Sequence, residues 1–455
     1  MTLLDPLFRW DAVDQHFSDR ARLQGMLDFE AALARAEASA GVIPAAAGPA
    51  ITAKCRAELF DAASIAAAAV PSGSPAIPLV KQLTALVAKD DAESARFVHW
   101  GATSQDAIDT GIILQSRSAL DVLQAECVRL SDALAALARA HATTPLAART
   151  WMQQALPTTF GLIAAGWLDA VDRCSDRLAD AARRALVLQF GGAVGTLAAL
   201  GGRGLDVARV LGAELRLPVP DLPWHAHRDR MAELASALAL LAGTLGKIAR
   251  DISLHMQTEV GEIFEPAGEG RGGSSTMPHK RNPVACAVVL AAATRVPGLA
   301  ATMFSAMVQE NERGLGGWHA EWETLPDIFQ LTGGALHHLA DTVSGLEIDA
   351  ARMAANLDIT HGLIFAEAVQ MALGHSLGRL PAHDLVQEAT RRALAEKRHL
   401  KDVLAADARV SKHLPPTELA RLFDPRQYLG VAQAMIDRVL DSHAARRNAS
   451  SAAGD

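Results

Sequence analysis

The sequence has few aromatic residues and few cysteines. Aromatic side chains make up 4% of the 455 residues, although 50% of the residues are hydrophobic. Aliphatic helix formers, chiefly Ala and Leu, must therefore supply most of the core. The cysteines form no CxxC pair, which argues against a zinc site or a disulfide framework and fits a reducing cytoplasm. They are Cys55, Cys127, Cys174 and Cys286.

An excess of positive charge is also missing. The formal net charge is −8, which gives no basic surface for nucleic acid or for an anionic membrane. Charged residues such as Asp5, Arg9 and Asp11 leave no room for the apolar core of a signal peptide. No apolar run approaches the ~18 residues of a membrane helix. We therefore expect a cytoplasmic protein that binds neither nucleic acid nor membrane.

Proline is absent from several long segments, and these segments show helical periodicity. Over 106–141, and again after Pro223, apolar residues recur in steps of three and four, the spacing of one helix face. Helices are also expected over 159–190 and over 284–295, the latter ending near Pro297. Seams of this kind pack helices at shallow angles in bundles. No period-two pattern is long enough for a parallel sheet, so the predicted fold class is all-α.

The distribution of these segments predicts three domains. Residues 1–105 contain shorter helices broken by Gly and Pro, most clearly at 70–75, whereas 106–350 carry the long helices. Shorter helices return over 351–455. Long, Ala-rich central helices need partner helices on more than one side, so we expect a homo-oligomer. A monomeric bundle of amphipathic helices is the alternative.

A loop rich in glycine, proline and cationic residues separates two of the predicted helices. Residues 265–283 contain four glycines, three prolines and two adjacent serines, followed by His279, Lys280 and Arg281. This composition is typical of a mobile, anion-facing lid. A phosphate loop is the main competitor, but the GxxxxGK[ST] pattern is absent and no strand pattern precedes the segment.

Three segments resemble sequence blocks of the fumarase/aspartase superfamily. Residues 273–283, GSSTMPHKRNP, are similar to its GSSxMPxKxNP signature. Residues 99–106, HWGATSQD, resemble the HxGxTSxD block, and residues 149–155, RTWMQQA, resemble the RTHxQxA block. The resemblance extends over essentially the whole chain. It implies a central bundle of long helices, a homotetramer with active sites shared between subunits, and a reaction that uses no metal and no cofactor.

The resemblance also implies a mechanism. A proton is removed from the carbon next to a carboxylate, which gives an enolate-like intermediate, and a group then leaves the β-carbon. Ser274 stands at the position of the base, and Lys280 at that of a cation that favours the Ser274 alkoxide and the enolate. Asp106 is assigned either a direct role or the capping of the helix that follows.

The other matched residues are expected to bind substrate. For His99, the satisfaction of buried helix ends is an equal alternative, and the signature leaves the position of His279 variable. The substrate-binding candidates are His99, Thr103, Ser104, Arg149, Thr150, Trp151, Gln153, Ser275, Met277, Asn282 and Arg313.

Trp151 departs from the lyase pattern, in which a histidine at this position assists the leaving group. A carboxylate, whose acid has a pKa near ~4, can leave without a proton donor, so a lactone can be opened by β-elimination without that histidine. Residues 149–157 and 312–322 resemble the bacterial 3-carboxy-cis,cis-muconate cycloisomerases of the superfamily. The resemblance implies a tricarboxylate substrate and the interconversion of carboxymuconate with its lactone, in the protocatechuate branch of the β-ketoadipate pathway of aromatic degradation.

Two other functions remain open. One is a lyase that releases fumarate from adenylosuccinate or from another C–N or C–O substrate, and the other is a binding homologue with a vestigial site. The unbroken signature loop disfavours the second. A metal site at His225 and His227 is disfavoured because no third ligand is in view. Arg228 and Arg230 are further candidate cations for the substrate, with pairing to Asp229 as the alternative.

Overall fold

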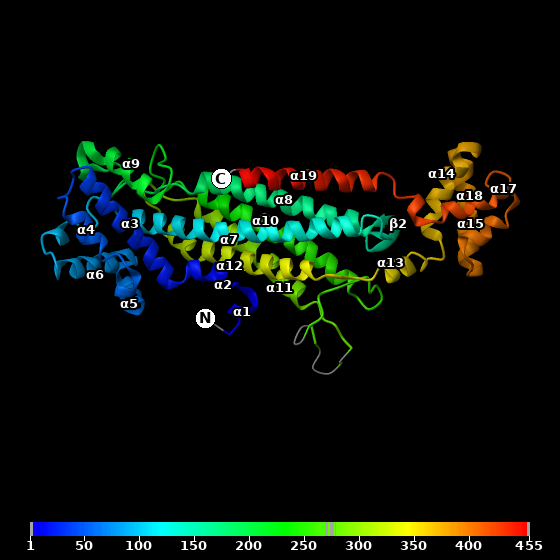
Figure 1. Ribbon diagram of the computed structural model, residues 1–455, viewed down its shortest axis with the longest axis horizontal. Helices are drawn as coiled ribbons and strands as arrows, with labels where there is room; N and C mark the ends of the chain where they lie inside the picture. The colour runs from blue at the N-terminus through cyan, green and yellow to red at the C-terminus, as the bar shows by residue number, and fades with distance from the viewer. Residues whose placement is uncertain (1–2, 269–271, 274–276, 278, 453–455) are drawn as a thin grey trace. The chain divides into compact units, whose positions relative to one another are not determined.

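The computed structural model describes residues 3–268, 272–273, 277 and 279–452, and it is built almost entirely from helices (Figure 1). The prediction of an all-α fold is confirmed. The long helices dominate the ribbon, and α7 alone has 37 residues. These helices are α7 Ser104–Ala140, α8 Phe160–Ala185, α10 Asp229–His255, α11 Val284–Ala306 and α12 Gly317–Ser344.

Shorter helices precede, separate and follow the long ones. The described strands form two antiparallel pairs, β1 with β2 and β3 with β4. The strands are β1 Pro145–Thr150, β2 Gln153–Thr159, β3 Ile263–Phe264 and β4 Glu347–Ile348. The shorter helices are α1 Asp5–Phe8, α2 Asp11–Asp14, α3 Asp19–Ser39, α4 Ala47–Thr52, α5 Ala62–Ser72, α6 Ala76–Ala88, α9 Gly204–Leu215, α13 Ala350–Asn356, α14 Ala366–Leu377, α15 Arg379–Glu396, α16 Leu400–Ala405, α17 Ala408–Ser411, α18 Pro416–Leu422 and α19 Ala432–Ala452.

Most of the helix boundaries that the sequence predicted lie close to those of the structure. The predicted break at 70–75 is confirmed, because α5 ends at Ser72 and Gly73 adopts the left-handed conformation (φ 65°) that terminates a helix. The predicted end of a helix near Pro297 is wrong, since α11 continues through it to Ala306. Proline removes one backbone hydrogen bond and crowds one carbonyl, and a helix of 23 residues keeps its remaining bonds.

Two helices are long and apolar enough to cross a membrane by length and composition alone. They are α10 and α11, and the apolar windows of the two are 61% and 33% buried within this chain. The sequence did not suggest either, because Arg295 and other polar residues interrupt the apolar runs. Buried core helices meet the same criterion, so α11 stands out chiefly for the apolar surface that this chain leaves uncovered.

The chain divides into two compact units, each assembled from three segments. Unit 1 comprises residues 1–128, 173–246 and 288–338, and unit 2 comprises 129–172, 247–287 and 339–455. These units are defined by which segments pack together in space. The three predicted domains are consecutive stretches of the sequence, and they stay a prediction.

Each unit has its own packing. In unit 1, α3 crosses α7 so closely that a Cβ on Gly25 would lie 2.9 Å from the carbonyl oxygen of Gly111. In unit 2, a separate apolar core joins α14 to α18, which Figure 1 shows gathered together in orange. Ile436 of α19 packs on Ala164 and Ala165 of α8, and the two helices run side by side in Figure 1.

Candidate active site

The first sequence block lies at the start of α7, in unit 1. The helix begins at Ser104, and the Asp106 carboxylate in its first turn accepts a hydrogen bond from the Thr103 backbone N–H (3.0 Å). Asp106 also accepts from the two backbone N–H groups of 191–192 (3.0 and 2.9 Å), and its Oδ1 lies 2.7 Å from Nε2 of His225. Asp106 is fully buried. Asp106 therefore connects the first turn of α7 to the glycine turn at 191–192. It accepts the Thr103 N–H from a position inside the helix, so it is not the N-cap residue itself.

Arg313 belongs to the same unit and is hydrogen-bonded to uncharged acceptors. Its guanidinium donates to Thr103 Oγ1 (3.1 Å), Gln105 Oε1 (3.1 Å) and the Ala193 carbonyl (3.0 Å). Within the described ranges no carboxylate forms an ion pair with it. Arg313, Thr103 and Ser104 are all half-buried, so a positive charge and two hydroxyl groups occur together in a partly desolvated place. This arrangement suits a carboxylate ligand.

His99 is held by a buried carboxylate on α3. Its Nδ1 lies 2.5 Å from Oε1 of Glu30, and the Glu30 side chain is 1% exposed. Burial lowers the pKa of His99, but Glu30 and Asp106 raise it, and the net shift is upward. His99 also has φ 59°, a conformation that costs a non-glycine residue of order 1–3 kcal/mol. The strained backbone and the acidic partner favour an imidazolium that is held in one orientation.

The second sequence block forms the β1–β2 hairpin of unit 2, which the sequence did not predict. Thr150 pairs with Gln153 across the turn, and the two central residues, Trp151 and Met152, have φ 52° and 66°. Positive φ at both central residues defines a type I′ turn, which normally selects Asn-Gly. Trp151 is nevertheless 98% exposed. A strained turn that presents a bare indole favours a function for that side chain.

Arg149 lies on β1 and is paired, in contrast to Arg313. Its guanidinium makes a bidentate contact with the Glu262 carboxylate (3.0 and 2.9 Å). The fully buried Glu262 also accepts from Asn356 Nδ2 (2.7 Å) and lies 2.7 Å from Nδ1 of His255. Burial raises the pKa of Glu262, but these hydrogen bonds outweigh burial and lower the pKa to about 2. A cavity of about 620 Å³ adjoins the cluster and is lined by Arg149, His255 and Trp151 among others.

The signature loop is partly described. Ser274 and Ser275, the expected base and its neighbour, lie outside the described residues. Lys280 is exposed. Its backbone N–H donates to the Met277 carbonyl (3.1 Å), and the backbone N–H of Asn282 donates to the Gly272 carbonyl (2.9 Å). These contacts close the loop on itself.

Glu265 and Arg281 fasten the same loop at its ends. The Glu265 carboxylate accepts from two backbone N–H groups in the first turn of α11, those of residues 285–286 (3.2 and 2.8 Å). Arg281 makes a bidentate contact with Glu347 (both 2.9 Å) and covers the ring of Phe264 at 4.8 Å. Arg281, one of the three cationic residues that follow the serines in the sequence, therefore anchors the loop.

The structure assigns different partners to the other candidate cations. Arg228 does not pair with Asp229 but with Asp109 and Glu321, and Arg230 donates to the carbonyl of Arg184. Sequence reasoning missed the acidic partners, Asp109, Glu262 and Glu321. Among the residues that the structure describes, no group of three or more His, Cys, Asp or Glu side chains could hold a metal ion.

The candidates fall into two groups, one in each unit. His99, Thr103, Ser104 and Arg313 belong to unit 1, with Thr103 and Arg313 in direct contact. The hairpin residues Arg149, Thr150, Trp151 and Gln153 belong to unit 2, as do Met277, Lys280 and Asn282 of the loop. The first group offers a cation that no described carboxylate neutralises, and the second offers an exposed indole, a cavity and a cationic loop.

Comparisons with known proteins agree with these features. The model of a family described as lyase matches residues 9–298, and one described as adenylosuccinate lyase C-terminus matches residues 362–439. A 3-carboxy-cis,cis-muconate cycloisomerase of Bradyrhizobium diazoefficiens is 59% identical over 97% of this chain and 98% of its own. A nitrosuccinate lyase of Streptomyces davaonensis is 43% identical over 96% of this chain and 94% of its own.

A solved structure extends the likeness to three dimensions. The crystal structure of a 3-carboxy-cis,cis-muconate lactonizing enzyme from Pseudomonas putida superposes with a TM-score of 0.93 at 54% identity. The match covers 97% of this chain and 98% of that one. The chain is therefore an enzyme that belongs to the lyase family of the fumarase/aspartase superfamily.

Proposed function

We propose that the chain interconverts 3-carboxy-cis,cis-muconate and its lactone, 4-carboxymuconolactone. The observation that carries the proposal is the 59% identity, over nearly the full length, to a protein named for this reaction. Trp151 at the hairpin tip supports it, because the chemistry needs no proton donor for the leaving group. The substrate itself supplies that group as a carboxylate.

The reaction is an isomerisation in which every atom is kept. In the direction of ring closure, one substrate carboxylate adds to the alkene carbon that lies β to another carboxyl group. The C–O bond forms as the alkene electron pair moves onto that carboxyl group, which gives an enolate-like intermediate. Ser274 then gives a proton to the α-carbon and is left as an alkoxide, and ring opening reverses each step. Tethering of the nucleophile supplies much of the rate, since effective molarities of well-oriented groups reach ~10⁵–10⁸ M.

The described residues divide the binding work. We assign one substrate carboxylate to Arg313 with Thr103 and Ser104, because that guanidinium has no anionic partner in the described part of the chain. Lys280 and Asn282 are assigned to the enolate. The remaining candidates are assigned to the walls of the substrate site, and these are His99, Arg149, Thr150, Trp151, Gln153, Ser275 and Met277.

We further propose a cytoplasmic homotetramer whose subunits share active sites. Two exposed apolar features support a second copy as the covering partner. The α11 window is only 33% buried, and Trp151 is 98% exposed. Apolar surface that a single chain leaves exposed often marks a protein–protein contact.

The experiment is a turnover assay with purified, chelator-treated protein and 3-carboxy-cis,cis-muconate, followed by loss of the conjugated-diene absorbance. Wild-type protein is expected to convert the substrate. Ser274→Ala is expected to lower kcat by roughly 10²–10⁴-fold, the usual contribution of a positioned acid or base. Ser253→Ala is the matched control, because the Ser253 hydroxyl donates to a carbonyl within α10. Full activity of Ser274→Ala would require another base.

A C–N lyase is the second candidate, and one relative favours it. A protein 43% identical to this chain is named for the cleavage of nitrosuccinate. The same preparation should therefore be offered nitrosuccinate and adenylosuccinate, with release of fumarate as the readout. Fumarate release without diene loss would replace the cycloisomerase proposal.

A further inference from the structure

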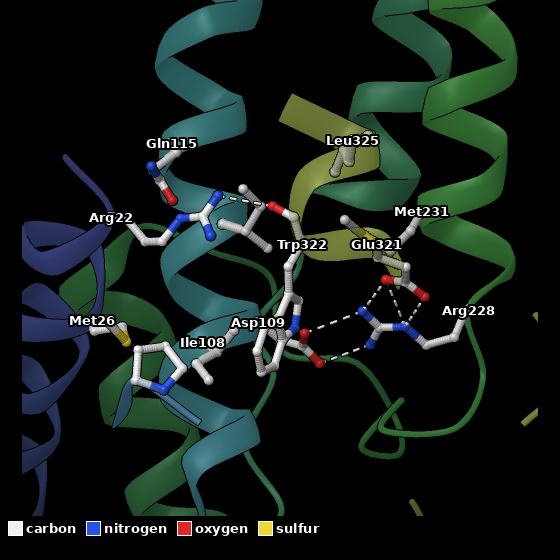
Figure 2. Close-up of a pocket in the computed structure, with 12 residues that line it drawn as sticks. Arg22, Met26, Ile108, Asp109, Gln115, Arg228, Met231, Glu321, Trp322 and Leu325 are labelled. Carbon is white, nitrogen blue, oxygen red and sulfur yellow. Dashed lines mark hydrogen bonds and ion pairs between the residues drawn. The ribbon is translucent and has the colours of Figure 1, made fainter. Parts of the chain in front are cut away.

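A cluster of three buried charges lies in unit 1 and has no part in the proposed chemistry. Arg228, just before α10, makes bidentate contacts with Asp109 of α7 (2.7 and 3.1 Å) and is also bound by Glu321 of α12 (2.6 to 3.1 Å). Figure 2 shows the guanidinium between the two carboxylates. None of the three residues is more than 5% exposed.

Such a cluster is a weak device for stability. The desolvation of buried charges largely cancels their mutual attraction, and apolar replacements are often as stable. The cluster leaves Asp109 immobile, because Trp318 also donates its indole N–H to Asp109 Oδ1 (2.9 Å) and Gln189 donates to Oδ2 (3.2 Å). The two oxygens of Asp109 are thereby fixed in position.

Gln105 carries this fixed geometry to Arg313. Its Nε2 donates to Asp109 Oδ2 (3.1 Å) and to the His225 carbonyl (2.8 Å), while its Oε1 accepts from Nε of Arg313 (3.1 Å). A carboxylate and a carbonyl only accept hydrogen bonds, so they require the NH₂ end of the Gln105 amide to face them. The oxygen end must then face Arg313, which directs the guanidinium toward Thr103.

We propose that Asp109 is a positioning residue that acts through Gln105 to orient Arg313 for a carboxylate of the substrate. The proposal rests on the function proposed above, in which Arg313 binds that carboxylate. In this proposal the buried cluster of Asp109, Arg228 and Glu321 increases the affinity for substrate and takes no part in proton transfer. Loss of the link should therefore raise KM and leave kcat nearly unchanged.

The test is a double-mutant cycle with Gln105→Met and Arg313→Lys. Gln105→Met keeps the length of the side chain and removes both hydrogen-bonding ends. Alone, it should raise KM by roughly tenfold, because a hydrogen bond to a charged group contributes about that factor to an equilibrium constant. In the Arg313→Lys background it should add less than about twofold, because its effect passes through Arg313.

A matched aromatic pair tests the role of Asp109. Trp318→Phe removes an indole donor from Asp109 and should raise KM several-fold. Trp322→Phe, one turn later on α12, is the control, because the buried Trp322 indole N–H has no hydrogen-bond partner among the residues that the structure describes. Equal changes in KM for the two variants would overturn the proposal, as would additive effects of Gln105→Met and Arg313→Lys.

Binding is measured alongside turnover, so that this inference can fail separately from the proposed function. Tricarballylate, a saturated tricarboxylate, serves as the calorimetric probe. If wild-type protein binds it but turns over no carboxymuconate, the function fails, and non-additive losses of affinity in the cycle still support the positioning role. Additive losses in a protein that turns over carboxymuconate overturn the positioning role alone. A wild-type protein that neither binds the probe nor turns over the substrate overturns both.

Discussion

Two arginines from two matched sequence blocks differ in what they contact. Arg149, on β1, is held by the buried Glu262 carboxylate through two hydrogen bonds of 2.9 and 3.0 Å. Arg313 donates to a hydroxyl, an amide oxygen and a backbone carbonyl. The sequence offered both as cations for a tricarboxylate, but only Arg313 keeps its charge unpaired within the described part of the chain.

The difference separates two uses of the same residue type. A guanidinium already bound by a carboxylate must give up that contact, or share it, to bind a second anion. Its removal would leave Glu262 buried and charged with fewer partners. A guanidinium bound only to neutral acceptors can bind an anion without breaking an ion pair. Variants of Arg149 should therefore report mainly on stability, and variants of Arg313 mainly on substrate affinity.

The largest expected effect is the loss of stability in Arg149→Met. Removing one partner of a buried ion pair typically costs about 3–5 kcal/mol, and Arg149→Met leaves the buried Glu262 carboxylate with Asn356 and His255 as its remaining described partners. Unfolding by denaturant, followed by circular dichroism, measures the change. Arg149→Lys is the control and should recover part of the loss, because it keeps the charge but not the bidentate geometry. A normal unfolding midpoint together with a large rise in KM would show that Arg149 serves the substrate instead.

The sequence predicted the helices better than it predicted these contacts. Apolar residues at steps of three and four specify a helix from local information, so the spans over 106–141 and after Pro223 closely match α7 and α10. Pro297 misled because a single proline weakens a long helix without ending it. The β1–β2 hairpin was missed because Trp151-Met152 lacks any of the usual signals of a type I′ turn.

The partners of the charged residues could not be predicted from the sequence. Glu262 lies 113 residues from Arg149, and Asp109 lies 119 residues from Arg228. No periodicity links such pairs, and pairing depends on how distant segments pack. The matched blocks indicated which residues belong together in a family, but not which of the cations are neutralised. The adjacent Asp229 was the natural local partner for Arg228, and it was the wrong one.

The second prediction uses pH to sharpen the comparison. The pKa of Glu262 falls from an ordinary 4.5 to about 2 in the folded chain. Between those values the unfolded chain binds more protons than the folded one, so stability decreases as the pH falls. The stability that the ionised Glu262 contributes is complete above about pH 4.5 and is lost as the pH falls through about 2. This lowering of the pKa corresponds to about 3 kcal/mol in the free energy of unfolding.

Arg149→Met should flatten that acid-side slope, because it removes the two Arg149 hydrogen bonds and the positive charge that help to lower the pKa of Glu262. The slope is measured from the unfolding free energies of wild type and Arg149→Met at a series of pH values from neutral down to about 3. Arg313→Lys should keep the wild-type slope, because Arg313 contacts no titrating side chain in the described residues. Parallel slopes for wild type and Arg149→Met would mean that Arg149 is not what keeps Glu262 ionised.

The smallest expected effect in free energy is that of Arg313→Lys on substrate affinity. Lysine keeps the charge but loses the planar fork that contacts Thr103 and Gln105 and that, in the proposed function, binds a substrate carboxylate. We expect KM to rise by about 10–100-fold, equivalent to ~1.4–2.7 kcal/mol, with an unchanged unfolding midpoint. Arg117→Lys is the matched control, because Arg117 donates to two backbone carbonyls at the end of α9, outside the matched blocks. If both variants raise KM alike, the neutral partners of Arg313 do not mark a substrate anchor. If only Arg313→Lys does, the guanidinium that no described carboxylate pairs is the one that anchors the substrate, and Arg149 in the wall of the site contributes chiefly to stability.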